Sequence, residues 1–141
     1  MKGFLKKHWR KVVLVVVCAP FVGYLALCLI IGLGVRNAVS DAQSSFPRDP
    51  VTALISVATN EEAKLSERNR AIWALGQLGS PEALPTLHVL VTGEKCDHDE
   101  LICQREVETA IEACSGSTNI GAMIWRHGEL AEASKGRRNS P

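Results

Sequence analysis

An uncharged apolar run near the start of the chain limits most strongly what this sequence can fold into. Residues 12–35 read VVLVVVCAPFVGYLALCLIIGLGV, 24 residues without a charge. As an α-helix this run would measure about 36 Å, which exceeds the roughly 30 Å hydrocarbon core of a bilayer. Pro20 lies inside the run, and we expect it to bend the helix slightly. The run therefore predicts a single transmembrane helix over 12–35 that contacts membrane lipid, preceded by a basic segment, 1–11.

A cleaved signal peptide is the alternative interpretation of the same run. Such a peptide has an apolar region of about 7–15 residues, followed by small residues at the cleavage site. The run here is longer, and Arg36 and Asn37 separate it from the weak candidate site Ala38-Val39-Ser40. The pattern favours an uncleaved, single-pass anchor.

The charges around the run are distributed unequally. Residues 1–11 hold five basic side chains and no acid, whereas only Arg36 and Arg48 are basic among the 15 residues after the run. The positive-inside bias predicts a cytoplasmic N-terminus and an exported remainder. We expect the membrane to be a bacterial inner membrane, with the rest of the chain in the periplasm. The choice of this membrane follows from the compactness of the chain, not from a particular residue. The net charge of +1 argues against a nucleic-acid partner.

The remainder of the chain has helical rather than alternating apolar spacing. Residues 36–49 are polar and rich in serine, and we interpret them as a linker between the membrane and a domain over 50–133. Residues 134–141 are interpreted as a flexible basic tail. Within the domain, capping residues and apolar stripes predict five helices: about 50–58, 66–78, from 81 to about 91, 99–114 and 118–133.

The apolar stripes repeat along the domain. An offset of 36 residues places Ala71 on Val107 and Ala74 on Ala110, and an offset of 33 places Leu54 on Leu87. The repeating unit is a helix pair of 33 to 36 residues, present about two and a half times. Because each pair has an apolar side that it cannot bury alone, the pairs are expected to stack.

One segment of this repeat resembles a known family. Residues 68–87 read RNRAIWALGQLGSPEALPTL, with an Arg, an Ala, Ala-Leu-Gly, a short turn and then Glu-Ala-Leu-Pro-x-Leu. This order resembles the HEAT-like repeat found in phycobilisome lyases. The second repeat departs from it, because Ala110-Ile111-Glu112 replaces Ala-Leu-Gly. The resemblance implies an all-α fold, with a short α-solenoid of about two and a half HEAT-like helix pairs after the membrane helix. It also implies a protein-binding role, and it transfers no catalytic residue.

Cysteines and acids near residue 100 are the candidates for chemistry. The spacing of Cys96, His98 and Cys103 matches no common structural zinc site, and the acids over 97–100 lack the glycine and distal glutamate of an EF-hand. Two interpretations stay open: a disulfide between Cys96 and Cys103, which an exported domain would favour, or buried or free thiols that include Cys114. We expect no metal and no cofactor.

The function predicted from the sequence is that of a non-catalytic protein-interaction module or scaffold anchored in a membrane. No Ser/His/Asp arrangement or phosphate-binding loop is present in the sequence. The end of a two-and-a-half-repeat stack is incompletely covered, so we expect a protein partner or a second copy to dock there, unless the stack caps itself. An accessory subunit of a membrane complex, or of a lyase-type enzyme, is the alternative. The candidate partner-contacting residues are Trp73, Trp125, Arg68, Arg70, Glu106 and Glu108.

Overall fold

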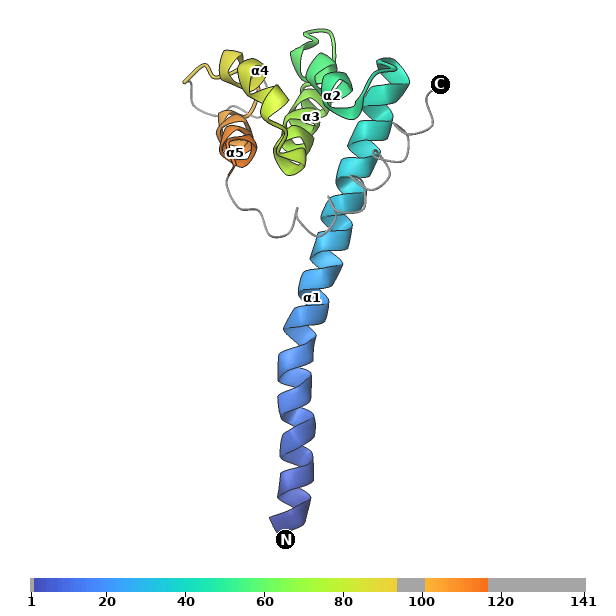
Figure 1. Cartoon of the computed structure of the whole chain (residues 1–141), viewed down its shortest axis with the longest axis vertical. Coiled ribbons are helices and arrows are strands. Elements are labelled where there is room, and N and C mark those ends of the chain that lie inside the picture. Colours follow the sequence, from blue (N-terminus) through green and yellow to red (C-terminus); the bar gives the residue numbers. More distant parts are fainter. Residues whose placement is uncertain (1, 94–100, 117–141) are drawn as a thin grey trace, which may run out of the picture.

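The computed structural model describes residues 2–93 and 101–116, with side chains described from residue 16 onward. This part of the chain is helical and contains no strand. A long N-terminal rod, α1, runs into a small group of helices packed beside its far end (Figure 1). The elements are α1 (Lys2–Ser45), α2 (Pro50–Thr59), α3 (Leu65–Leu78), the 3₁₀ turn η1 (Pro81–Ala83), α4 (Leu84–Val89) and α5 (Gln104–Cys114).

The first half of α1 stands apart from the other helices (Figure 1). Helix α1 has 44 residues and continues through Pro20. Its segment Val16–Ser45 is long and apolar enough to be a candidate membrane span, with a mean hydropathy of 2.5 in its most apolar window. Most large apolar side chains between Val16 and Leu33 are exposed by 38–69%, among them Val16, Phe21 and Leu29. The apolar N-terminal helix predicted from the sequence is therefore present, and many of its apolar side chains are exposed.

The segment that was expected to be a linker is helical instead. Helix α1 does not end at residue 35 but continues to Ser45 and packs against α2 and α3. Val35, Ala38 and Ala42 are buried at helical spacing, while the polar residues between them face solvent. The expectation of a linker over 36–49 is wrong for residues 36–45, because these three apolar side chains form a stripe that packing can bury.

Helices α2 and α3 form the first hairpin, close to the predicted bounds. Asp49 begins α2, where its carboxylate accepts a hydrogen bond of 3.0 Å from the Thr52 backbone N–H, and Pro50 takes the first helical position. Gly79 ends α3 in the left-handed conformation, with φ 58°, which glycine adopts without strain. The two helices bury the centre of the core, namely Ala53, Leu54, Ala58, Ala71, Ile72, Ala74 and Leu75.

The second hairpin joins η1 and α4 to α5, and its helices are shorter than expected. The helix predicted from residue 81 begins with the single turn η1 and continues as α4 only to Val89. Helix α5 begins at Gln104 and not at residue 99, so Cys103 precedes the helix instead of lying within it. Contacts with other segments explain the later start. Asn69 Oδ1 accepts a 3.0 Å hydrogen bond from the Cys103 backbone N–H and holds this residue in an extended conformation.

The two hairpins repeat the same packing. Ala71 and Ala74 in α3 are buried as their counterparts Val107 and Ala110 are in α5, and Leu54 and Leu87 are fully buried in the first helices of the two pairs. Helices α3 and α5 lie in contact, as stacked repeats require. The predicted solenoid arrangement is therefore present over the two described pairs. The predicted helix over 118–133 and the tail over 134–141 lie outside the described residues.

Candidate partner surface

Trp73 packs on the long apolar helix α1. A Cβ atom built on Gly34 of α1 would stand 3.1 Å from Cη2 of Trp73, so the indole ring lies directly over this glycine. Trp73 is half-buried and belongs to the margin of the core. The absence of a side chain at Gly34 makes this close approach possible. Trp73, predicted as a partner contact, is thus placed against a helix of its own chain.

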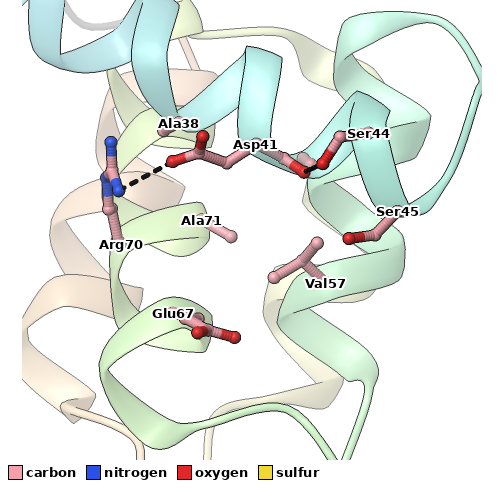
Figure 2. A pocket seen from close by; sticks show the side chains of 9 residues that line it. Ala38, Asp41, Ser44, Ser45, Val57, Glu67, Arg70 and Ala71 are labelled. Carbon is pink, nitrogen blue, oxygen red and sulfur yellow. Dashed lines mark hydrogen bonds and ion pairs between the residues drawn. The ribbon is translucent and has the colours of Figure 1, made fainter.

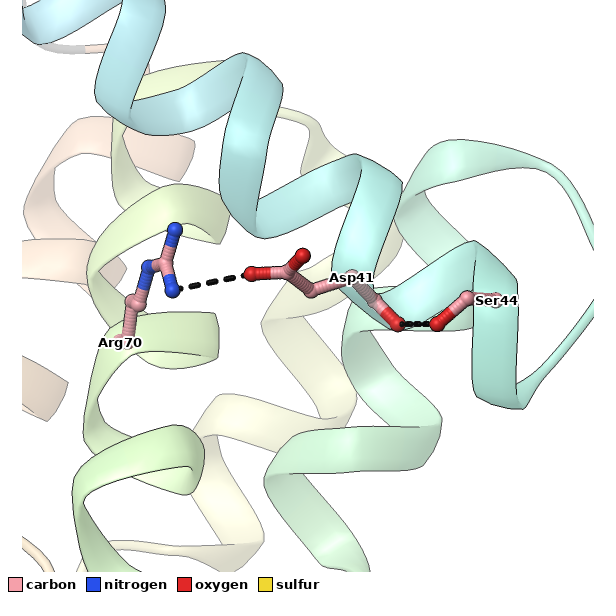
Figure 3. Close-up of polar contacts among 3 residues, drawn as sticks. All are labelled: Asp41, Ser44 and Arg70. Carbon is pink, nitrogen blue, oxygen red and sulfur yellow. Dashed lines mark hydrogen bonds and ion pairs between the residues drawn. The ribbon is translucent and has the colours of Figure 1, made fainter.

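The two arginines of the predicted surface also contact neighbouring helices. The guanidinium of Arg70 lies 3.0 Å from a carboxylate oxygen of Asp41 in α1, and this ion pair bridges α1 and α3 (Figure 3). Arg68 Nε donates a 3.1 Å hydrogen bond to the carbonyl of Ala58, in the last turn of α2. That carbonyl lacks a partner within its helix, so the cation there satisfies an orphan acceptor and complements the helix dipole.

These contacts give the direction of α3 relative to α1. Trp73 meets Gly34, whereas Arg70, one turn earlier in α3, meets Asp41, two turns later in α1. The two helices are therefore antiparallel, and the C-terminal end of α3 points back toward the exposed half of α1 (Figure 1). Helix α5 has the same direction as α3, because Cys103 contacts Asn69 at one end and Cys114 contacts Leu75 nearer the other.

A groove of about 270 Å³ lies where α1, α2 and α3 meet (Figure 2). Its walls are small side chains and its rim is charged, and it is lined by Ala38, Asp41, Ala42, Ser44, Ser45, Val57, Glu67, Arg70 and Ala71. The ion pair at its rim is open to water, since the side chain of Arg70 is 45% exposed and that of Asp41 69%. An ion pair this exposed contributes about 0–1 kcal/mol, so it adds little to the packing of α1 against α3.

The pKa of one acid, at the start of α2, departs from its ordinary value. The pKa of Asp49 is lowered from its ordinary value, because its carboxylate accepts the hydrogen bond from Thr52 at the start of α2; the nearby Arg48 acts in the same direction. The folded structure therefore stabilises the ionised carboxylate of Asp49 over its protonated form. This residue lies at a helix start and takes no part in the groove.

The remaining predicted residues do not join this group. Glu108 in α5 is exposed and Glu106, in the first turn of the same helix, is partly exposed. Trp125 lies outside the described residues. So does Cys96, and with it the predicted disulfide to Cys103, which is itself buried. Among the described residues, no three His, Cys, Asp or Glu side chains are grouped so that they could hold a metal ion.

Several positioning residues were not found from the sequence. Gln104 is the buried polar side chain of the described core; its Oε1 accepts a 2.8 Å hydrogen bond from the Thr92 N–H, and its Nε2 donates to the Leu90 carbonyl at 3.2 Å. Asn69 and Gln104 together fix the start of α5. Neither amide carries a sequence pattern that predicts such a role, whereas Gly34 could have been found from its place at the end of the apolar run, four residues before Ala38.

The geometry defines a class of protein: helical hairpins stacked in register, attached to a long apolar helix. Comparison with protein families agrees over part of this structure. The family model described as PBS lyase HEAT-like repeat matches residues 67–91, which run from the first turn of α3 to just beyond α4. The resemblance noted in the sequence is thereby confirmed for one repeat unit. Comparisons with curated proteins and with solved structures gave no match.

Proposed function

We propose that this protein is a membrane-anchored HEAT-like repeat protein that acts as a non-catalytic interaction module. One observation carries the proposal: α1 exposes most of its large apolar side chains between Val16 and Leu33 and then, without a break, becomes part of the helical repeat. Exposed apolar side chains on all sides of a helix are unfavourable in water and suit lipid. Stacked repeats offer an extended surface on which a protein partner can bind.

The placement in the membrane follows from charge and length. A helix needs about 20 apolar residues to cross the hydrocarbon core, and residues 12–35 supply 24. The five basic residues before the span favour a cytoplasmic N-terminus, so the repeat domain would face the periplasm of a bacterial inner membrane. The partner is a protein or a second copy of the chain, and neither nucleic acid nor a cofactor takes part.

Membrane anchoring is tested by changing the polarity of the span. In the full-length chain, Val22→Arg with Leu25→Arg places two charges near the middle of the span, each costing about 2.5–3.5 kcal/mol for insertion. We expect the wild type, and the control Val22→Leu with Leu25→Val, to stay with membranes after an alkaline carbonate wash. The arginine variant should be lost from them. An unchanged wash-resistant fraction for the arginine variant, or a wild type that washes off, would refute the anchor.

The interaction role is tested by site-specific photo-crosslinking in intact cells. A photoreactive residue at Glu108, exposed on α5, is expected to yield an adduct of one discrete mass, and a residue at Leu29, at an exposed apolar position of α1, to yield lipid adducts only. The opposite result, with protein adducts from Leu29 and none from Glu108, favours the second candidate function. That candidate is a small accessory subunit of a membrane complex. The exposed apolar surface of α1 supports it, because another membrane helix could pack there.

A further inference from the structure

We propose that the repeat domain lies directly on the bilayer surface, with Trp73 in the headgroup layer and the C-terminal ends of α3 and α5 facing the lipid. This inference rests on the proposed anchoring and adds a lipid-facing surface to a domain that was expected to be separated from the membrane by a linker. It commits to one occupant for that surface, the headgroup region of the membrane that α1 crosses.

The first support is the absence of any spacer between membrane and domain. The charge-free run ends at Val35 and Arg36 is the first charged residue after it, yet Val35 is already fully buried in the packed domain. The ring of Trp73 lies over Gly34, two residues before Arg36. Two residues of α-helix correspond to about 3 Å, so α1 fixes Trp73 at the depth where the hydrocarbon meets the headgroups.

The second support is the length of the exposed segment. A span of about 20 residues fills the hydrocarbon core, and counting from residue 12 it ends at Ile31. Residues 32–35 then lie in the headgroup layer, which adds several ångströms on each side of the core. Burial by the domain begins in the same region, on one side of α1: Ile30 and Leu33 are 65% and 60% exposed, whereas Ile31 is partly buried and Val35 is fully buried.

The third support is the chemistry of the side of the domain that faces the lipid. Because α3 is antiparallel to α1, its last residues point toward the membrane, and α5 has the same direction (Figure 1). The last residues at these two helix ends, 78–80 and 113–116, carry no charge, and the exposed carboxylates of Glu82 and Glu112 flank them. Glu61 and Glu62 lie in the loop before α3, at the opposite end of that helix. Tryptophan itself is enriched at membrane interfaces, where its ring suits a half-apolar environment.

The test measures the depth of Trp73 in the intact protein. The full-length chain with Trp9→Phe and Trp125→Phe keeps Trp73 as its single tryptophan. It is reconstituted in phosphatidylcholine vesicles whose acyl chains carry bromine either near the headgroup or near the chain end. We expect strong loss of Trp73 fluorescence with bromine near the headgroup, weaker loss with bromine near the chain end, and an emission maximum shifted to the blue.

A matched control places the tryptophan at the other end of α3. In the same background, Trp73→Phe with Glu61→Trp moves the fluorophore to the exposed loop before this helix. We expect no loss from either brominated lipid and full access to acrylamide in water. Circular dichroism is the check that both variants keep their helices.

The outcomes separate this inference from the proposed anchoring. If the protein withstands the carbonate wash and Trp73 is not quenched by brominated lipid, the domain stands away from the bilayer and the inference is wrong while the anchor holds. Equal quenching at residue 61 and Trp73 would also overturn it, because the domain would then lie on its side. If the chain does not stay with the vesicles at all, the proposed anchoring is what fails.

Discussion

The close packing of α3 on α5 can be tested at Gly76. Within a helix, replacing glycine by alanine normally stabilises by about 1 kcal/mol, because alanine loses less conformational freedom on folding. At Gly76 the added Cβ would stand 2.9 Å from Cα and 3.1 Å from Cβ of Ala110. A distance of 2.9 Å to a backbone atom cannot be relieved by turning a side chain, so α5 would have to move away from α3.

The two effects have opposite signs, and their sizes decide the outcome. Overpacking of a well-packed interface costs about 1–3 kcal/mol, which exceeds the gain of about 1 kcal/mol in helix propensity. We expect Gly76→Ala to destabilise the packed helices by about 1 kcal/mol. For a domain of this size that corresponds to a fall in Tm of about 4–8 °C.

The measurement is thermal unfolding of the full-length protein in detergent micelles, followed by circular dichroism. Gly23→Ala is the matched control: nothing lies within 4 Å of a Cβ at that position, so only the gain in helix propensity applies and Tm should not fall. Ala110→Gly in the Gly76→Ala background removes the 3.1 Å contact and should show favourable coupling in a double-mutant cycle. A rise in Tm for Gly76→Ala would refute the close approach of the two helices.

Three further substitutions test the ends and the centre of the hairpins. Asp49→Ala removes the cap of α2 and should cost about 1 kcal/mol in urea unfolding at pH 7. Since the folded-state pKa of Asp49 is lowered, this contribution is present above about pH 4 and is lost as the pH falls through the folded pKa; an equal cost at all pH values would contradict the cap. Leu54→Ala, at a fully buried position, should cost about 2–5 kcal/mol, against at most about 0.5 kcal/mol for Val89→Ala at an 82% exposed one, and equal urea midpoints would place Leu54 outside the core. Arg68→Met keeps an unbranched apolar stem and removes the hydrogen bond to Ala58, so we expect a loss of about 1–2 kcal/mol in urea, which an unchanged midpoint would exclude.

The parts of the fold that follow from local spacing could be predicted from the sequence. Ala71 and Val107 occupy equivalent buried positions. An apolar stripe at helical spacing is buried on one face of its helix, whichever neighbouring helix packs against that face. The caps at Asp49 and Gly79 were also predictable, because helix ends need side-chain acceptors and left-handed backbone at defined positions. These features depend on neighbours within one or two turns.

The parts that depend on distant segments could not be predicted. The start of α5 is fixed by Asn69, 34 residues before Cys103, and no local pattern contains that contact. The contacts of two residues of the predicted partner surface also come from a distant segment. Trp73 and Arg70 look available on an isolated amphipathic helix, but α1 lies beside them and offers Gly34 and Asp41.

The extension of α1 past residue 35 shows how one helix meets two requirements in succession. In lipid a helix needs apolar side chains on all sides, and the run through Val35 supplies them. Against a domain it needs them on one side only, and Ala38 and Ala42 continue that side while mostly polar residues occupy the rest. The composition of residues 36–45, which is rich in polar side chains, is typical of a linker. The spacing of their buried apolar side chains is that of a helix. Because a continuous helix transmits position and a flexible linker does not, the membrane span that we propose for α1 would fix both the height and the rotation of the helices packed on its C-terminal part.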